Sequence, residues 1–517
     1  MSFCTVLSAA VQGLSVEMIR VEADVSNGLP MFHMVGYLSS EVKEASERVR
    51  TAIRNSGMKL PAKKIIVNLA PATVRKRGAS FDLPIALAVL AAMNYVPEEA
   101  LKGVAVIGEV SLEGKIRGVS GVLPIVMEAK NQGCTACILP EENEIEGRLV
   151  SGIKILPADN LEKLCAYLNG DEKEIHRKKQ GRSSAQRNIF ENKKEDFSDI
   201  CGQNAVKRAA EIAVAGGHNL LMAGPPGSGK SMIARRIATI LPELPLEESL
   251  EITRIYSVLG MIDKEQPLIT RRPFRSVHHT ITKTALVGGG MTPRPGEISM
   301  AHGGVLFLDE LAEFPRNVLE VLRQPLEEHQ IHIARNYGNF KFPAEFMLVA
   351  AMNPCPCGNY PDMQKCSCTP SQIQKYLGKV SQPFLDRMDL CIETPKVEYR
   401  ELDIERIGKK EEESSEVIRS RVVEARKLQK KRYEGTQIRT NSMLGPGEIR
   451  TYIPLGSAER KLMEKAFERM GLTARTYHKI LRVARTIADL DYSKKVTEKH
   501  LKEAIAYRSL DKKYWGR

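Results

Sequence analysis

The sequence predicts an α/β protein of several domains, and three observations support that prediction. The chain has 517 residues, which is more than a single hydrophobic core usually organises. Short apolar runs typical of buried strands alternate with segments of helical periodicity over residues 1–396. One of these runs, at 219–223, leads into a glycine-rich turn and then a helical segment. We expect four parts: an α/β domain at 1–170, a charged linker at 171–197, a second α/β domain at 198–396 and a helical domain at 397–517.

Composition limits the environment and the partners of the chain. Lysine and arginine together number 76 against 63 acidic residues, which gives a net charge of +13. Such an excess suits a polyanionic partner such as nucleic acid, although basic side chains that only solvate helices give the same total. No run approaches about 18 apolar residues, and the start lacks the order of a signal peptide, so we expect no membrane association. Ten cysteines, four of them clustered, indicate a reducing, cytoplasmic location.

The first domain contains a serine in the setting of a known protease family. Gly78-Ala-Ser80 and the segments at 107–114 and 121–124 resemble the proteolytic domain of Lon proteases, in which a lysine activates a serine nucleophile. The resemblance places Ser80 at the nucleophile and the apolar Leu123 at the lysine. A serine hydroxyl without a base is not deprotonated at neutral pH. We therefore expect a Lon-protease-like fold without peptidase activity; a surviving activity with another base is the alternative.

The turn after the strand at 219–223 carries the pattern Gly-x-x-x-x-Gly-Lys-Ser. A strand before it and a helix after it are the context in which this pattern forms a P-loop, the phosphate-binding turn of nucleoside triphosphatases. The N–H groups of the turn and of the helix start favour phosphate. Lys230 is expected to reach the β- and γ-phosphates of ATP, and the Ser231 hydroxyl to bind Mg²⁺. The predicted nucleotide-binding residues are Gly224, Pro225, Pro226, Gly227, Ser228, Gly229, Lys230 and Ser231.

Two further apolar strands end in polar residues that suit ATP hydrolysis. The run at 305–308 closes on Asp309 and Glu310, which is the Walker B pattern, and the run at 348–352 closes on Asn353. Asp309 is expected to complete the Mg²⁺ shell. Glu310 is expected to orient and deprotonate the attacking water, because phosphoryl transfer depends chiefly on positioning.

These motifs, in this order, resemble the AAA+ ATPases, a family of P-loop motors. In that family the asparagine is called sensor 1 and helps to place the water, so Asn353 receives this role. The segment at 383–390 resembles the arginine-finger region of the magnesium-chelatase and minichromosome-maintenance branch, where an arginine acts on the nucleotide of a neighbouring subunit. Arg387 is the matching residue, so the resemblance implies a ring. Arg475 matches sensor 2, which contacts the γ-phosphate. A surface ion pair for Arg387 and an ordinary helix-surface role for Arg475 are the alternatives.

Two insertions typical of the same branch are expected to contact DNA. The glycine- and proline-rich stretch at 278–298 matches the helix-2 insert and contains Arg294. Residues 331–342 alternate across a glycine and predict a hairpin with Arg335 and Lys341. In ring helicases such loops enter the pore, where basic side chains grip phosphates.

Two other polar groups have open interpretations. The basic run at 75–77 is either a DNA-contacting surface or a solvated turn. His278 and His279 suggest a metal, but no carboxylate stands at ligand spacing in the sequence, so a polar loop is favoured.

Four cysteines follow Asn353 closely. They form two Cys-x-Cys pairs, and four thiolates in one short loop can close a tetrahedral zinc site that staples the loop. We favour a structural zinc without a catalytic role; free thiols or a redox pair are the alternatives. The four residues are Cys355, Cys357, Cys366 and Cys368.

The last part of the chain predicts a small helical lid. Apolar residues recur at helical spacing in four segments, at 411–432, 457–470, 475–489 and 497–507.

Taken together, the three blocks resemble the ComM/YifB family of magnesium-chelatase-like AAA+ ATPases over essentially the whole chain. For ComM members the family implies a hexameric helicase that uses ATP and Mg²⁺ to drive branch migration on single-stranded or branched DNA during natural transformation. Two other classes remain. A chelatase-type motor would remodel a protein partner, and an ATP-dependent protease is disfavoured by the apolar residue at Leu123.

Overall fold

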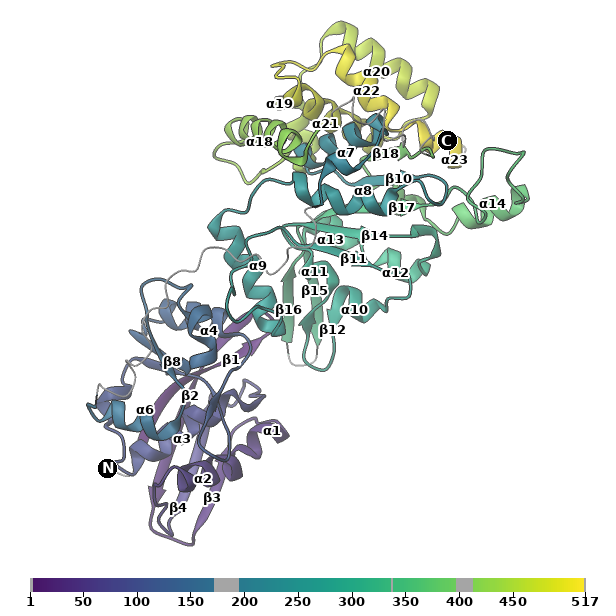
Figure 1. Cartoon of the computed structure of the whole chain (residues 1–517). Coiled ribbons are helices and arrows are strands. Elements are labelled where there is room, and N and C mark those ends of the chain that lie inside the picture. Colours follow the sequence, from purple (N-terminus) through teal and green to yellow (C-terminus); the bar gives the residue numbers. More distant parts are fainter. Residues whose placement is uncertain (1–2, 172–194, 336–337, 397–411, 516–517) are drawn as a thin grey trace.

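The computed structural model shows an elongated molecule in three tiers (Figure 1). An α/β unit that contains the N-terminus lies at one end, a second α/β unit lies in the middle, and a group of helices lies at the other end. The described residues are 3–171, 195–335, 338–396 and 412–515, so most of the predicted linker at 171–197 lies outside them. Within these ranges, no helix combines the length and the apolar character that crossing a bilayer requires.

The first unit is built on a seven-stranded mixed sheet. Its strands lie in the order β3-β4-β2-β1-β5-β8-β9. β1 pairs antiparallel with β2 and parallel with β5, so a hairpin half and a βαβ half share one sheet. The bounds are β1 (Phe3–Gln12), β2 (Ser15–Ser26), β3 (Met31–Val35), β4 (Lys64–Ala70), β5 (Val104–Val106), β8 (Ala136–Pro140) and β9 (Lys154–Ala158).

Helices cover both faces of this sheet. The helix α3 (Asp82–Ala92) is buried along its entire length against β1 and β2, which explains its nearly continuous apolar sequence. The helix α4 (Val122–Asn131) packs with Ala9 and Ala105, whereas the neighbouring Val6 of β1 belongs to the core around α3. The helical segment between β3 and β4 is interrupted. It forms α1 (Ser40–Lys43) and α2 (Ala45–Asn55), and α6 (Leu161–Leu168) ends the unit.

The central unit contains a five-stranded sheet in which every pair is parallel. Its strands lie in the order β11-β14-β17-β10-β18. The carboxyl ends of all five strands therefore lie at one edge. The strands are β10 (Leu220–Ala223), β11 (Phe274–Val277), β14 (Val305–Leu308), β17 (Met347–Met352) and β18 (Leu390–Glu393).

The helix predicted after the P-loop is present in the central unit. It is α8 (Lys230–Ile237), and it ends in a short 3-10 turn. The helices α7 (Asn204–Gly216) and α9 (Leu246–Leu259) flank it in sequence. The two predicted insertions form hairpins, which are β12 (Gly288–Gly289) with β13 (Arg294–Pro295) and β15 (Gln330–Arg335) with β16 (Gly338–Pro343).

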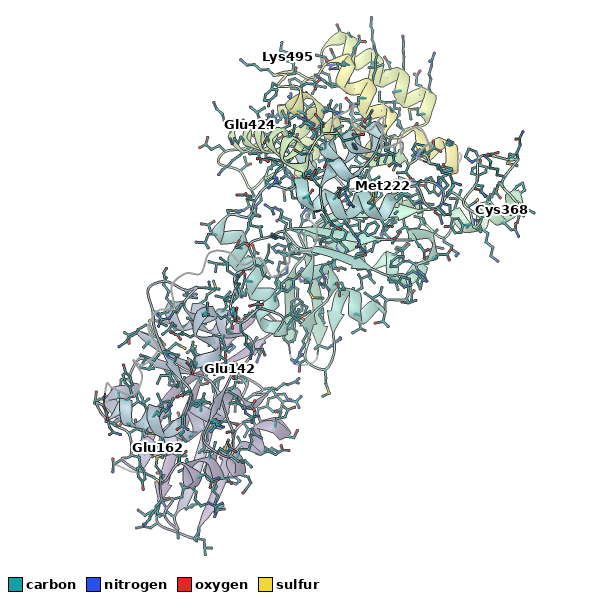
Figure 2. All side chains as sticks on the ribbon, viewed as in Figure 1. Glu142, Glu162, Met222, Cys368, Glu424 and Lys495 are labelled. Carbon is teal, nitrogen blue, oxygen red and sulfur yellow. The ribbon has the colours of Figure 1, made fainter. Side chains whose placement is uncertain are left out.

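The C-terminal helices share a core with the central unit. The helices α18 and α21 pack against α7, and their buried residues belong to the cluster that contains Leu220 and Met222 of β10. Figure 2 shows Met222 inside the molecule beneath these helices. The helices are α18 (Ser415–Arg432), α19 (Pro446–Tyr452), α20 (Ser457–Met470), α21 (Ala474–Leu490), α22 (Glu498–Ala506) and α23 (Ser509–Trp515).

The first and central units touch through α4, α9 and two hairpins. The Ser257 hydroxyl of α9 donates a 2.6 Å hydrogen bond to buried Glu146. Arg254, also on α9, donates to the backbone oxygen of Leu14 in the β1–β2 turn. Leu14 belongs to the same apolar cluster as Phe342 of β16. The first unit is therefore seated against the base of the predicted pore hairpin.

Candidate active site

The glycine-rich turn lies between β10 and α8 at the carboxyl edge of the central sheet. A Cβ on Gly224 would lie 2.1 Å from Thr394 Oγ1, so only glycine fits between the turn and the end of β18. Gly229, which caps α8, has a φ of +78°. These two positions explain the need for glycine in the turn. The buried Ser228 hydroxyl lies 3.2 Å from Thr394 Oγ1. This contact joins segments far apart in the sequence, and no sequence motif predicts it.

Lys230 points into this turn. Its Nζ donates to the backbone oxygens of Gly224 and Pro225, each at 2.8 Å, and lies 3.3 Å from Asn353 Oδ1. Burial lowers the pKa of the ammonium to about 8, and the nearby charge of Asp309 opposes that change. The predicted P-loop lysine and the predicted sensor asparagine are thus within hydrogen-bond distance of each other.

Ser231 and Asp309 also meet. The Ser231 hydroxyl donates a 2.7 Å hydrogen bond to Asp309 Oδ2, while Asp309 Oδ1 accepts from the backbone N–H of Glu310. A hydroxyl and a carboxylate at hydrogen-bond distance are oxygen donors of the kind that Mg²⁺ prefers. These two residues therefore fit the predicted Mg²⁺ site.

Glu310 adopts a left-handed backbone conformation, with a φ of +53°. Its carboxylate is half exposed, and Oε2 lies 3.1 Å from His279 Nδ1. The ring centroids of His278 and His279 lie 4.0 Å apart with the ring planes tilted by 36°, and one ring nitrogen of each and a Glu310 carboxylate oxygen lie within 4.8 Å of one another. The expectation that these histidines have no carboxylate partner was wrong, because it considered sequence spacing alone. β11 and β14 are adjacent parallel strands, so the residues that follow them converge.

Arg387 lies near the amino-terminal ends of the strands, opposite the edge at which their carboxyl ends lie. It lies three positions before the start of β18, and β18 runs parallel to β10 with Leu390 opposite Leu220. The P-loop leaves the carboxyl end of β10, so Arg387 lies at the end of the sheet opposite the nucleotide turn of its own chain. Its side chain is 8% exposed and pairs with Glu327 at 2.5 Å. The ion pair considered as an alternative is thus present.

Arg475 is exposed in the first turn of α21. One turn further along the helix, Lys479 donates to the backbone oxygen of Met388, which anchors α21 beside the Arg387 segment. Burial lowers the pKa of Arg387, and the charges of Arg323 and Arg475 act in the same direction. Arg387 and Arg475 therefore lie near each other, at the edge opposite the P-loop.

The basic residues of the two insertions are exposed on neighbouring hairpins. Arg294 lies on β13, and Arg335 and Lys341 lie on β15 and β16. Arg335 Nε is 3.4 Å from the backbone oxygen of Gly290, so the hairpins meet near their tips. On the β15–β16 hairpin the buried residues, such as Ile331 and Phe342, alternate with exposed ones, as the sequence predicted.

The four cysteines form one group. The Sγ atoms lie 3.4 Å (Cys355–Cys357), 3.8 Å (Cys355–Cys366) and 3.6 Å (Cys357–Cys366) apart, and Cys368 completes the cluster. Thiolates at a Zn–S distance of about 2.3 Å in a tetrahedron are about 3.8 Å apart, so the cluster fits zinc. Hydrogen bonds, above all that from the Asn359 backbone N–H, lower the pKa of the Cys357 thiol, whereas the neighbouring thiols raise the pKa of Cys366 and Cys368. Figure 2 shows Cys368 on a lobe that projects from the side of the central unit.

The region around Ser80 differs from the P-loop. Ser80 lies half-buried in a 3-10 turn before α3, and Leu123 is fully buried in the first turn of α4, where its N–H donates to Glu146. Within the described residues, no basic side chain hydrogen-bonds to the Ser80 hydroxyl. In the basic run at 75–77, Lys76 is fully buried and donates to the backbone oxygen of Pro71. This lysine therefore offers no charge to DNA.

The parallel sheet, the P-loop and the Asp-Glu strand end define a P-loop ATPase of the AAA+ type. Models of the magnesium chelatase subunit ChlI match residues 196–402 and 21–143, and the model of its C-terminal part matches 412–508. The chain is 44% identical to the protein YifB of Escherichia coli and 42% identical to the competence protein ComM of Haemophilus influenzae, and each alignment covers 99% of this chain and 98% of the relative. Lon protease 2 of Bacillus subtilis is 29% identical over 31% of this chain and 33% of its own length. The chain belongs to the ComM/YifB family of magnesium-chelatase-like AAA+ ATPases.

Proposed function

We propose that this protein is an ATP-hydrolysing ring motor that moves on DNA, and that its activity is branch migration in recombination during natural transformation. The observation that supports it best is the convergence of three motifs at the carboxyl ends of β10, β14 and β17. Lys230 and Ser231 of the P-loop contact Asn353 and Asp309, respectively, which come from two other segments. No other arrangement within the described residues combines a phosphate-binding turn with acidic residues in this way.

Each residue of this site has one task. Lys230 exchanges its bonds to the Gly224 and Pro225 oxygens for bonds to the β- and γ-phosphates. Ser231 and Asp309 hold Mg²⁺, which supplies neutralisation of the phosphate charge. Asn353 positions the water and Glu310 accepts its proton. Glu310 must first leave His279, whose ring nitrogen lies 3.1 Å away, before its carboxylate can serve as the base.

The position of Arg387 supports a ring. An arginine at the edge opposite its own P-loop reaches a nucleotide only when a second subunit brings its P-loop to that edge. We therefore assign Arg387 and Arg475 to the nucleotide of the neighbouring subunit, in a homo-hexamer. Arg387 leaves Glu327 when the phosphates arrive, because the more highly charged partner offers the stronger charge-assisted bonds.

DNA is the proposed track because two exposed basic hairpins meet. Arg294, Arg335 and Lys341 place three positive charges on neighbouring loops, and a chain with a net charge of +13 attracts a polyanion over longer distances. The relative ComM is named a competence protein, which agrees with a role on incoming DNA. We place the protein in the cytoplasm, where the absence of disulfides among its ten free cysteines is expected.

A protein partner is the second candidate. The family models carry the description of a magnesium chelatase subunit, and we consider a chelatase-type motor that remodels a protein partner as the alternative. The same ATP site and ring would serve this function, so only the track distinguishes the two candidates.

The test is ATP hydrolysis with and without single-stranded and branched DNA over a salt series. We expect DNA to stimulate turnover and salt to reduce the stimulation steeply, because each phosphate contact contributes about 0.9 to the slope of log affinity against log salt. Turnover that no DNA changes would contradict the DNA track and favour a protein partner.

A further inference from the structure

The cysteine loop lies directly against the P-loop. Gly358, between the two cysteine pairs, has a φ of +79°, and a Cβ at this position would lie 2.2 Å from Pro226 Cδ and 2.8 Å from its Cγ. The backbone of Gly358 is therefore in contact with the proline ring at the centre of the nucleotide turn. The same loop begins immediately after Asn353, so it is held at one end by a residue of the active site.

A second route connects the loop to the other side of the turn. The ring of Tyr360 lies 6.0 Å from the ring of Tyr514 on α23, and the Tyr514 hydroxyl donates a 2.7 Å hydrogen bond to Glu393. Glu393 is the last residue of β18 and precedes Thr394, whose hydroxyl contacts Ser228. The P-loop is thus supported from the cysteine loop both at Pro226 and at Ser228.

Outside its cysteines and Tyr360, the cysteine loop offers few apolar side chains. Its side chains between 354 and 369 are mostly small or polar, and its Met363 is 65% exposed. The only buried member of the cluster is Cys355, which accepts the N–H of Tyr360 at its Sγ. The apolar contacts of the loop with the central core run through Tyr360 and the four cysteines themselves, so a metal held by those cysteines would fix the loop in a single conformation.

We propose that the metal held by these four cysteines positions the P-loop, so that ATP affinity depends on metal occupancy. Zn²⁺ fixes the loop, the loop fixes Gly358 against Pro226, and Pro226 sets the turn that receives the phosphates. The cysteines and Gly358 act on the nucleotide only through the P-loop, so they are positioning residues. This role presupposes the ATP site proposed above, although it does not depend on DNA as the track.

The coupling is reciprocal. If the metal raises the affinity for ATP, then nucleotide raises the affinity for the metal by the same factor. This gives a measurement that needs no turnover. The rate at which a chelator removes Zn²⁺ from the full-length protein is followed with a zinc-sensitive dye, with and without saturating ADP. We expect ADP to slow the removal. An equal rate with and without ADP would overturn the proposal, as would a protein that contains no zinc and takes none up.

Two variants distinguish the effect of the metal from that of the contact between Gly358 and Pro226. Cys368→Ser removes a ligand, and we expect loss of zinc together with a rise of about tenfold in the Kd for ATP, because small misplacements of a binding group are costly. Gly358→Ala keeps all four cysteines, so the metal remains while the added methyl displaces Pro226, and we expect a similar rise in Kd. Its matched control is Gly435→Ala, which has a φ of +80° but no atom within 4 Å of the added carbon.

A double-mutant cycle isolates the contact. In a Pro226→Ala background the ring atoms that meet Gly358 are gone, so adding Gly358→Ala is expected to cost much less ATP affinity than it does in the wild type. If the zinc-free Cys368→Ser protein, shown to be folded by its thermal melt, bound ATP as the wild type does, the proposal would be wrong. Failure of the proposed function would look different, because then the zinc-loaded wild type itself would not bind ATP.

Discussion

In two places of the chain a glycine-containing turn precedes a helix and carries a reactive side chain. The two places differ in how many polar partners surround that side chain. At the P-loop, Lys230 contacts two backbone oxygens of the turn and the Asn353 side chain, and Ser231 meets Asp309. Near the start of α3, Ser80 lies in a unit that is similar to Lon protease, but Leu123, which we predicted at the position of that family's lysine, is apolar and buried. A fold can persist after its catalytic groups are lost, so function must be argued from the site.

The contacts of the first unit with the central unit indicate a supporting role. Its α4 helix and β1–β2 turn contact α9 and the base of the β15–β16 hairpin, and the buried Glu146 accepts from both Leu123 and Ser257. Leu123 therefore lies beside the junction between the two units. The contacts suit a domain that supports the pore hairpin of the motor.

The largest expected effect is the contrast between the two turns themselves. Lys230→Ala is expected to abolish nucleotide binding and hydrolysis, because the phosphates lose their main cation. Ser80→Ala is expected to leave both unchanged within about twofold, since surface and spectator positions rarely contribute more. Binding of a fluorescent ATP analogue and phosphate release measure the two effects. A large loss of ATPase activity in Ser80→Ala would contradict the claim that Ser80 contributes little to ATP hydrolysis.

Arg387→Ala comes next. Loss of an arginine finger is expected to lower turnover by about 1,000-fold while ATP binding persists. The control is a mixture with Lys230→Ala subunits. Those subunits carry an intact finger and the Arg387→Ala subunits carry an intact P-loop, so a mixed ring should regain part of the activity. Two inactive variants that stay inactive when mixed would contradict the assignment of Arg387 to the neighbouring subunit.

Glu310→Gln is expected to lower turnover by about 100-fold or more, since the amide cannot take the proton of the water. Lys230, Ser231 and Asp309 remain, so ATP should stay bound and the ring should stay assembled. Size-exclusion chromatography with light scattering in the presence of ATP measures whether the ring stays assembled with nucleotide bound. Ordinary turnover in this variant would remove Glu310 from the role of base.

The smallest effect concerns pH. In the nucleotide-free protein burial lowers the pKa of Lys230 to about 8, and bound phosphates favour the ammonium and raise the pKa again. ATP affinity should therefore be full below pH 8 and fall as the pH rises above it, by at most about tenfold per unit. Titration calorimetry between pH 7 and pH 9.5, in buffers of different ionisation enthalpy, should show proton uptake above pH 8. A flat profile in the wild type would contradict the pKa, and Lys230→Arg, which stays charged, is the matched control.

The sequence predicted the parts of the site that are contiguous in the chain. The P-loop, the Asp309–Glu310 strand end and the β15–β16 hairpin each carry their signal within a few residues, so periodicity and motif spacing were enough. The missed features all depend on strand order or on packing between distant segments. The His279–Glu310 contact needs β11 beside β14, the Gly358–Pro226 contact needs the cysteine loop folded back, and the burial of Lys76 is invisible in a basic run.

The most direct test of the account is strand movement. Wild-type protein, Glu310→Gln and the double variant Arg335→Ala/Lys341→Ala are given ATP and a labelled forked or branched DNA, and displacement of the labelled strand is followed. The account predicts displacement by the wild type alone, with the double variant retaining the ATP turnover that needs no DNA because its changes lie on the hairpin and not at the P-loop. Robust ATP turnover by the wild type without movement of any DNA strand would contradict a DNA motor.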